Sequence, residues 1–296
     1  MRLAAAALLM AVLSAGALAQ STENVTVTGT KSREVLLKFV QSFAAPARIS
    51  GKMVRWQEGV CPLTVGLKPQ FTQFFTGHMK DVAARAGAPV NARATCKPNI
   101  EIVFTTTPQA LVDNVRARRP ALLGYFDNDR QADALAKVSH PIQAWYTTAT
   151  KDLRGKSVLD NAMLQGTGET PAIAGDMGSL IWSSAAVTGS RLGDGKSSAF
   201  YHIIILVEPD SLKDYEIGTL GDYIAMLALT QMNGLDSCQA LPSIMNLMAK
   251  DCAPITGLSD ADMAYLKGLY RMSADRNLNI QRDQIAYDMQ QALEGK

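Results

Sequence analysis

Apolar residues recur with helical spacing in several stretches of the chain. Residues 33–45 place Val35, Leu36, Phe39, Val40 and Phe43 on one face, and Ser32 stands where a helix N-cap belongs. A second amphipathic helix is predicted from Pro69 to about Ala86, with proline in its first turn and Gly87 just past its end. Further helices are predicted from residue 108 to a stop or bend near Pro120, and at about 219–233, 259–270 and 282–295.

Other stretches are rich in β-branched and aromatic residues and predict strands. They are residues 24–30, 52–56, 61–67, 99–107, 141–150 and 199–209. The last, "AFYHIIILVEP", is almost continuously apolar, as expected of a central strand that is buried on both faces. Residues 151–199 are rich in Gly, Ser, Thr and Asp, and predict a long loop with a hairpin that ends at "GDG" (193–195). Since no linker divides the remainder, we expect one α+β domain over 51–296 and an N-terminal strand and helix extension over 20–50.

The first twenty residues, "MRLAAAALLMAVLSAGALAQ", have the layout of a cleavable signal peptide. Arg2 supplies the positive region, Leu3 to Val12 the apolar core, and "ALA" the small residues before a cut near Ala19. No other segment approaches 18 consecutive apolar residues, so no transmembrane segment is expected in the mature chain. The sequence therefore predicts a periplasmic or secreted protein, with residues 1–19 removed.

Export changes the interpretation of the four cysteines, because disulfides persist in oxidising compartments. Four cysteines allow three pairings, and we favour Cys61–Cys96 with Cys238–Cys252 because each pair belongs to one region of the chain. A metal site built from all four thiolates is the alternative, but no CxxC pair is present to seed one.

Charge and short motifs exclude several classes of function. The 29 basic and 27 acidic residues nearly balance, so nothing favours nucleic acid or an anionic membrane as partner. The stretch "GSRLGDGKS" (189–197) has one residue too many for a phosphate-binding loop and precedes a strand, so it is interpreted as a turn. The histidines His78, His140 and His202 are scattered, and no GxSxG or SxxK motif occurs.

One stretch, "LALTQMNGLDS" (227–237), has the spacing of the HExxHxxGxxH motif of metzincin zinc proteases when Gly234 is aligned with the glycine of that motif. "PSIMN" (242–246) then stands where the Met-turn belongs, with Met245 as its methionine. "LSDADMAYLKGLY" (258–270) resembles the helix that follows in matrixin-like members. Together with "VRW" (54–56) and "PNIEIVF" (98–104), these stretches resemble a family of exported bacterial proteins of unknown function with a metzincin-like (degenerate zinc metalloprotease) layout.

This resemblance covers roughly residues 50–272 and implies a particular architecture. It implies a mixed β-sheet with packed helices, a degenerate active-site helix, a Met-turn and C-terminal helices. The same alignment places Leu227, Gln231 and Ser237 at the zinc-ligand positions and Ala228 at the position of the catalytic glutamate. Leucine and alanine neither bind Zn²⁺ nor transfer a proton, and glutamine and serine are poor ligands, so no metal, cofactor or catalytic residue is predicted there.

Three hypotheses for function remain open at this level. The first is a catalytically inactive, metalloprotease-like protein that binds a peptide or an envelope protein in a vestigial groove around Gln231, Asp236, Ser237 and Met245. The second is a hydrolase with a non-zinc site, built from His202 and carboxylates of the loop 151–199. The third is a structural component of the cell envelope whose N-terminal arm, residues 20–50, docks on a partner. A purely structural role for the helix, with Gly234 as its C-cap and Met245 as a space filler, is the alternative to the groove.

Overall fold

The longest strand, β6 (Ser197–Val207), forms the centre of the sheet in the computed structural model, which describes residues 32–43, 45–93, 95–161 and 193–295. From Ile203 to Val207 every side chain of β6 is buried, with at most 5% of its surface exposed. A strand that contacts packed elements on both faces needs such a continuous apolar run. The prediction of a central, doubly buried strand is therefore confirmed.

A mixed sheet surrounds β6. Its strands are β1 (Val54–Arg55), β2 (Pro62–Val65), β3 (Ile100–Phe104), β4 (Ile142–Lys151) and β5 (Ser157–Leu159). The order is β2-β3-β6-β4-β5, and β1 adds a short parallel pairing to β6. β2, β3 and β6 are parallel, whereas β4 runs antiparallel to both β6 and β5. The predicted α+β class with a mixed sheet is confirmed.

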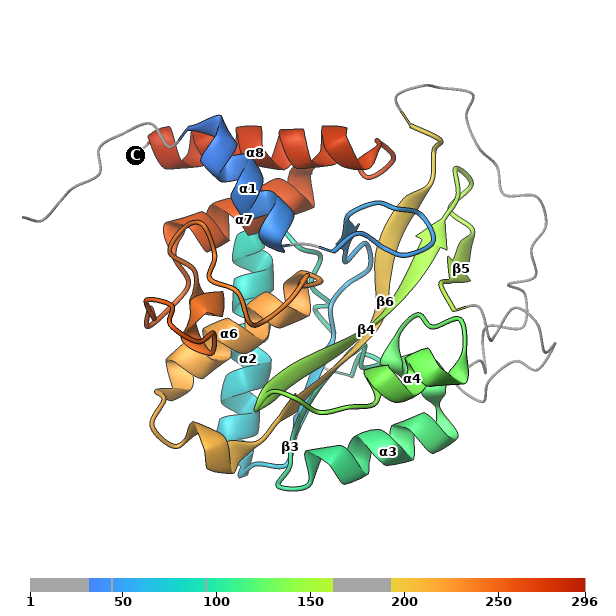
Figure 1. Ribbon diagram of the computed structural model, residues 1–296, viewed down its shortest axis with the longest axis vertical. Helices are drawn as coiled ribbons and strands as arrows, with labels where there is room; N and C mark the ends of the chain where they lie inside the picture. Colours follow the sequence, from blue (N-terminus) through green and yellow to red (C-terminus); the bar gives the residue numbers. More distant parts are fainter. Residues whose placement is uncertain (1–31, 44, 94, 162–192, 296) are drawn as a thin grey trace, which may run out of the picture. The chain divides into compact units, whose positions relative to one another are not determined.

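Helices cover both faces of this sheet (Figure 1). The larger core lies between the sheet and the helices α1 (Arg33–Phe43), α2 (Pro69–Ala86), α6 (Ile217–Leu229), α7 (Asp260–Arg271) and α8 (Leu278–Glu294). A smaller core on the other face includes α3 (Pro108–Arg118) and the 3-10 turn η1 (Pro120–Leu123), with α4 (Asp129–Leu135) alongside. Two more 3-10 turns, η2 (Pro209–Leu212) and η3 (Ile244–Leu247), flank α6 in the chain.

The helix α2 has the predicted boundaries. Proline occupies its first turn, and Gly87 caps its end with φ 81°, a left-handed conformation that favours glycine. The turn near Pro120 also falls where it was expected, because α3 stops at Arg118 and η1 begins at Pro120. These local signals were sufficient to predict the helix ends because each acts within one helical turn.

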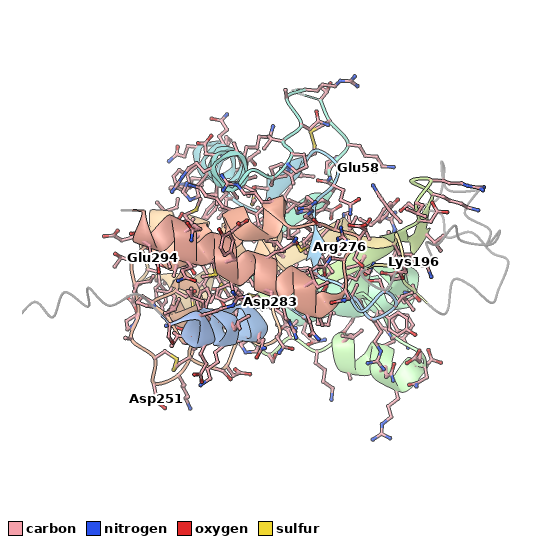
Figure 2. The ribbon with its side chains drawn as sticks, turned by 90° about the horizontal axis from the view of Figure 1, so that it is seen from above. Glu58, Lys196, Asp251, Arg276, Asp283 and Glu294 are labelled. Atoms are coloured by element: carbon pink, nitrogen blue, oxygen red, sulfur yellow. A yellow bond between two sulfur atoms is a disulfide. The ribbon has the colours of Figure 1, made fainter. Side chains whose placement is uncertain are left out.

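The helix α1 is part of the main core. Leu36, Phe39, Val40 and Phe43 are fully buried, and the rings of Phe43 and Tyr265 lie 4.8 Å apart. α1 lies beside α8 (Figure 2). The Arg33 guanidinium of α1 is 3.3 Å from the carboxylate of Asp283 on α8. The residues of α1 that face inward are therefore not free to dock on another protein.

Both favoured disulfides are present. Cys61 and Cys96 have Cα atoms 6.0 Å apart, and those of Cys238 and Cys252 are 5.4 Å apart. Among the described helices, none combines the length and the apolar character needed to cross a lipid bilayer. The predicted signal peptide (1–19), the strand 24–30 and most of the loop 151–199 lie outside the described residues.

Candidate functional site

The helix α6 ends earlier than its sequence pattern predicts. It stops at Leu229, and Thr230 is already extended, with φ −141° and ψ 143°. The carbonyl of Gln231 instead accepts a hydrogen bond from the N–H of Ala45, just after α1, so the backbone finds partners outside the helix. The prediction that the helix continues to Asn233 with Gly234 as its C-cap is therefore wrong. Gly234 lies beyond the helix, and a Cβ added there would meet nothing within 4 Å.

Because α6 ends at Leu229, the two positions that the metzincin alignment assigns to one helix face, Leu227 and Gln231, do not lie on the same helix. Leu227 is inside α6 and points into the main core with 1% of its surface exposed, and Ala228 is fully buried. Gln231 lies outside the helix, so it does not share an i, i+4 face with Leu227. Two ligands at these positions would not converge as they do in an HExxH helix.

The residues of the predicted groove are spread over different environments. Met245 lies in η3, is 2% exposed and packs in the main core, where η3 contacts α6. Asp236 and Ser237 are exposed on the loop after α6. Gln231 alone of the four lines the cleft described next. The structure therefore does not bring the four residues together at one site.

An open cleft of about 850 Å³ lies beside β4. Its wall on the sheet side is β4 from Gln143 to Thr148, and Gln231 contributes from the segment after α6. The side-chain Oε1 of Gln231 is buried and has no hydrogen-bond donor among the described residues. A buried acceptor without a donor costs about 1–3 kcal/mol, so a change that brings a donor to this amide would stabilise the segment after α6. The remaining lining residues come from the segment after α1, from η1 and its following residues, and from α4 and its following residues: Pro46, Arg48, Leu123, Gly124, Tyr125, Gln131, Ala134, Leu135, Lys137 and Ser139.

The backbone edge of β4 faces this cleft. The carbonyl of Thr148 accepts a hydrogen bond from the N–H of Asp160, on the side away from β6, and the carbonyl of Tyr146 faces Gly124. In an antiparallel pair, alternate residues direct both N–H and C=O to the same side, so Ala144 shares this orientation. Within the described residues, the N–H and C=O of Ala144 and the N–H of Tyr146 have no hydrogen-bond partner. The edge can thus accept one more extended segment.

The side chain of Tyr146 connects this edge to the end of α6. Its hydroxyl donates to the carbonyl of Leu227 over 3.0 Å. Burial raises the pKa of Tyr146, so the phenol stays protonated and keeps its donor role at any physiological pH. Tyr146, which lines the cleft, is therefore held in place by its hydrogen bond to α6.

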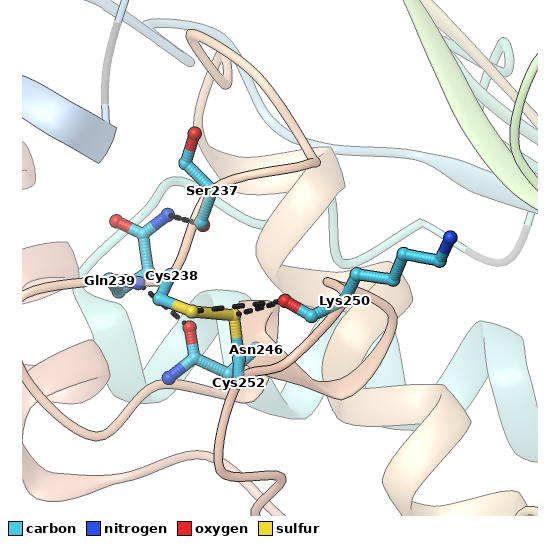
Figure 3. The surroundings of a disulfide bond; sticks show 6 residues. All are labelled: Ser237, Cys238, Gln239, Asn246, Lys250 and Cys252. Carbon is cyan, nitrogen blue, oxygen red and sulfur yellow. Dashed lines mark hydrogen bonds between the residues drawn. A yellow bond between two sulfur atoms is a disulfide. The ribbon is translucent and has the colours of Figure 1, made fainter.

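The disulfide Cys238–Cys252 braces the loop that follows Gln231 (Figure 3). Within this loop, the side-chain Oδ1 of Asn246 accepts a 2.8 Å hydrogen bond from the N–H of Gln239. Gln239 in turn accepts a 2.8 Å hydrogen bond from the Ser42 hydroxyl of α1. The loop after α6 is thus tied to both η3 and α1.

A chain of hydrogen bonds joins a serine, a histidine and an aspartate at the end of the cleft. The hydroxyl of Ser139 lies 2.9 Å from Nδ1 of His140, and Nε2 of His140 lies 2.9 Å from Asp236. Ser139 lines both the β4 cleft and a second one, of about 600 Å³, at the start of α3. The side chain of Asp236 is 86% exposed, so water screens its charge strongly.

His202, the residue of the hydrolase hypothesis, lies in a third cleft of about 680 Å³. Its Nε2 is 3.3 Å from the carboxylate of Glu101 on β3, and its Nδ1 is buried with no partner among the described residues. This hydrogen bond holds the pKa of Glu101 below its ordinary value. In the described part of the loop 151–199, Asp160 binds Thr148 and Thr150, and Asp194 binds Lys52. The carboxylate that the structure places at His202 is therefore Glu101.

Comparisons with family models, with curated proteins and with solved structures found no match to this chain. Among the described residues, no group of three or more His, Cys, Asp or Glu side chains is arranged to hold a metal ion.

Proposed function

We propose that this chain is an exported, disulfide-bonded protein with a metzincin-like layout that binds an extended polypeptide in the β4 cleft and has no zinc protease activity. Two disulfides in the described chain support export, because such bonds persist outside the reducing cytoplasm. The layout is supported by the parallel β2–α2–β3 unit and by η3, which carries Met245 against α6.

The residues at the aligned positions support the proposed absence of zinc chemistry. Leu227 and Ala228 offer no atom that ligates Zn²⁺ or accepts a proton, and both lie inside the main core. A water molecule activated by a metal would need an open position at this helix. The core packing of α6 occupies that space.

The observation that carries the binding function is the outward edge of β4. The unpaired N–H and C=O of Ala144 and the unpaired N–H of Tyr146 lie along an open cleft of about 850 Å³. Addition of a strand to a free sheet edge is a common mode of peptide recognition, in which main-chain hydrogen bonds supply affinity and flanking pockets supply specificity. The buried Oε1 of Gln231 would gain its missing donor from such a ligand after a small rotation of the amide.

Elemental analysis and a chelator test the loss of zinc chemistry. We expect purified mature protein to contain no stoichiometric zinc, to show no chelator-sensitive peptidase activity, and to bind peptide equally well with and without chelator. Stoichiometric zinc together with peptidase activity that the chelator abolishes would contradict the proposal.

A second candidate function, serine-type hydrolysis, is favoured by one observation. If His140 donates Nε2–H to Asp236, its Nδ1 can accept the proton of the Ser139 hydroxyl, which is the division of roles in a Ser-His-Asp triad. This function ranks second because the exposed Asp236 gives the histidine little electrostatic support.

A fluorophosphonate probe followed by peptide mass mapping tests this candidate. Serine-type chemistry predicts covalent labelling at Ser139 that is lost in His140→Ala. Ser211→Ala, which removes another hydroxyl from the neighbouring cleft, should label normally. No label at Ser139 in the unmodified protein would exclude the candidate.

A further inference from the structure

Two cations and no carboxylate line the β4 cleft. Arg48 comes from the segment after α1 and Lys137 from the segment after α4, so the two charges approach from separate parts of the chain. None of the other residues that line the cleft is Asp or Glu. The charged side chains that line the cleft are therefore all positive.

Both charges are uncompensated in the described structure. Neither Arg48 nor Lys137 has a carboxylate within 4.0 Å among the described residues, and both side chains are exposed. By contrast, Arg116 of α3 binds two aspartates of α4, and Lys151 of β4 binds Glu58. Arg48 and Lys137 therefore keep their charges available for a ligand.

We infer that the occupant of the β4 cleft is an acidic segment of a partner protein, bound in an extended conformation. This inference rests on the binding function proposed above and specifies its ligand. In an extended chain that pairs with Ala144 and Tyr146, every second side chain projects to the same face, with a spacing of about 7 Å. Asp or Glu at such alternating positions can reach cations on the cleft wall while the backbone hydrogen bonds form. Arg48 can hold a carboxylate through two parallel N–H donors, and Lys137 acts as a point charge.

The two exposed cations contribute more to the specificity for acidic ligands than to the affinity of the complex. Exposed ion pairs contribute little each, so we expect the two cations together to change the affinity about tenfold at low salt. At an ionic strength of about 1 M the screening length falls to about 3 Å, and most of this difference should disappear.

Selection from a displayed library of random twelve-residue peptides tests the inference. The baits are the unmodified protein and the double variant Arg48→Glu with Lys137→Glu. A control variant combines Arg85→Glu with Lys267→Glu, which makes the same change of net charge at exposed cations of α2 and α7, outside the cleft. We expect peptides of negative net charge to be enriched on the unmodified and control proteins, and peptides of positive net charge on the cleft variant. An enriched acidic peptide should then bind the cleft variant about tenfold more weakly by fluorescence anisotropy.

The possible outcomes separate the inference from the function on which it rests. Enrichment with no charge bias, or an acidic bias that persists in the cleft variant, overturns the charge inference and leaves peptide binding in place. If the net charge of the enriched peptides shifts as much on the control variant as on the cleft variant, the selection depends on the net charge of the protein. This result also overturns the inference. If no bait enriches any peptide, the proposed binding function itself fails.

Discussion

Replacing Asp262 by alanine should lower the free energy of unfolding by about 3–5 kcal/mol. Asp262 is fully buried in α7, and its carboxylate accepts hydrogen bonds from the Ser243 hydroxyl (2.6 Å) and the N–H of Ile244 (2.9 Å). It also accepts from the N–H of Ser259 (3.0 Å), which completes the capping box of α7. Alanine would leave three donors without an acceptor in a dry environment, at a cost of about 1–3 kcal/mol each before relaxation.

Thermal and urea unfolding monitored by circular dichroism would measure this loss. We expect the midpoint temperature of Asp262→Ala to fall by about 10 °C, since each kcal/mol corresponds to about 2–4 °C for a domain of this size. The conservative change Asp262→Asn should cost about 2 kcal/mol, because its amide presents a donor where two acceptor oxygens are needed. Asp214→Ala, at an exposed aspartate, serves as control. A stability of Asp262→Ala within 1 kcal/mol of the unmodified protein would show that this network does not hold η3 against α7.

Replacing Ala144 by proline should weaken peptide binding by about tenfold or more. Proline removes the outward N–H of this residue, which is a donor available to an added strand, and its ring occupies the edge. The fold should tolerate the change, because proline is accepted on strand edges where the N–H does not serve the sheet. Ala144→Ser keeps both the size and the N–H, and should bind normally. Equal affinities of the proline and serine variants, with both folded, would exclude pairing along this edge.

The sequence was most informative where the signals are local. Pro69 and Gly87 bracket α2 and predicted both of its ends, and the apolar run of β6 identified the central strand. The end of α6 was mispredicted because the apolar pattern continues past Leu229, while the backbone after Thr230 pairs with the end of α1, which is distant in sequence. The short helix α4 was not predicted. It buries only Ala132, and its local signals are the N-cap residue Asn128 and the acidic Asp129 in its first turn.

Most features of the β4 cleft could not be predicted from the sequence. Gln231 was named from the metzincin alignment, and it does line the cleft. Arg48 and Lys137 stand in unremarkable connections, and only the tertiary fold brings them to the same cleft as β4. The free edge of β4 depends on strand order and direction, which a single sequence does not reveal. Similarly, the hydrogen bond between His140 and Asp236 joins residues that are 96 positions apart.

Amide hydrogen exchange of the peptide complex, resolved residue by residue by NMR, tests the central claim most directly. The N–H groups of Ala144 and Tyr146 face the cleft, whereas those of Gln143 and Trp145 already face β6. Binding of a selected acidic peptide should therefore slow exchange at Ala144 and Tyr146 and leave Gln143 and Trp145 unchanged. Unchanged exchange at Ala144 and Tyr146 in a saturated complex would contradict strand addition at β4, whatever the affinity of the peptide.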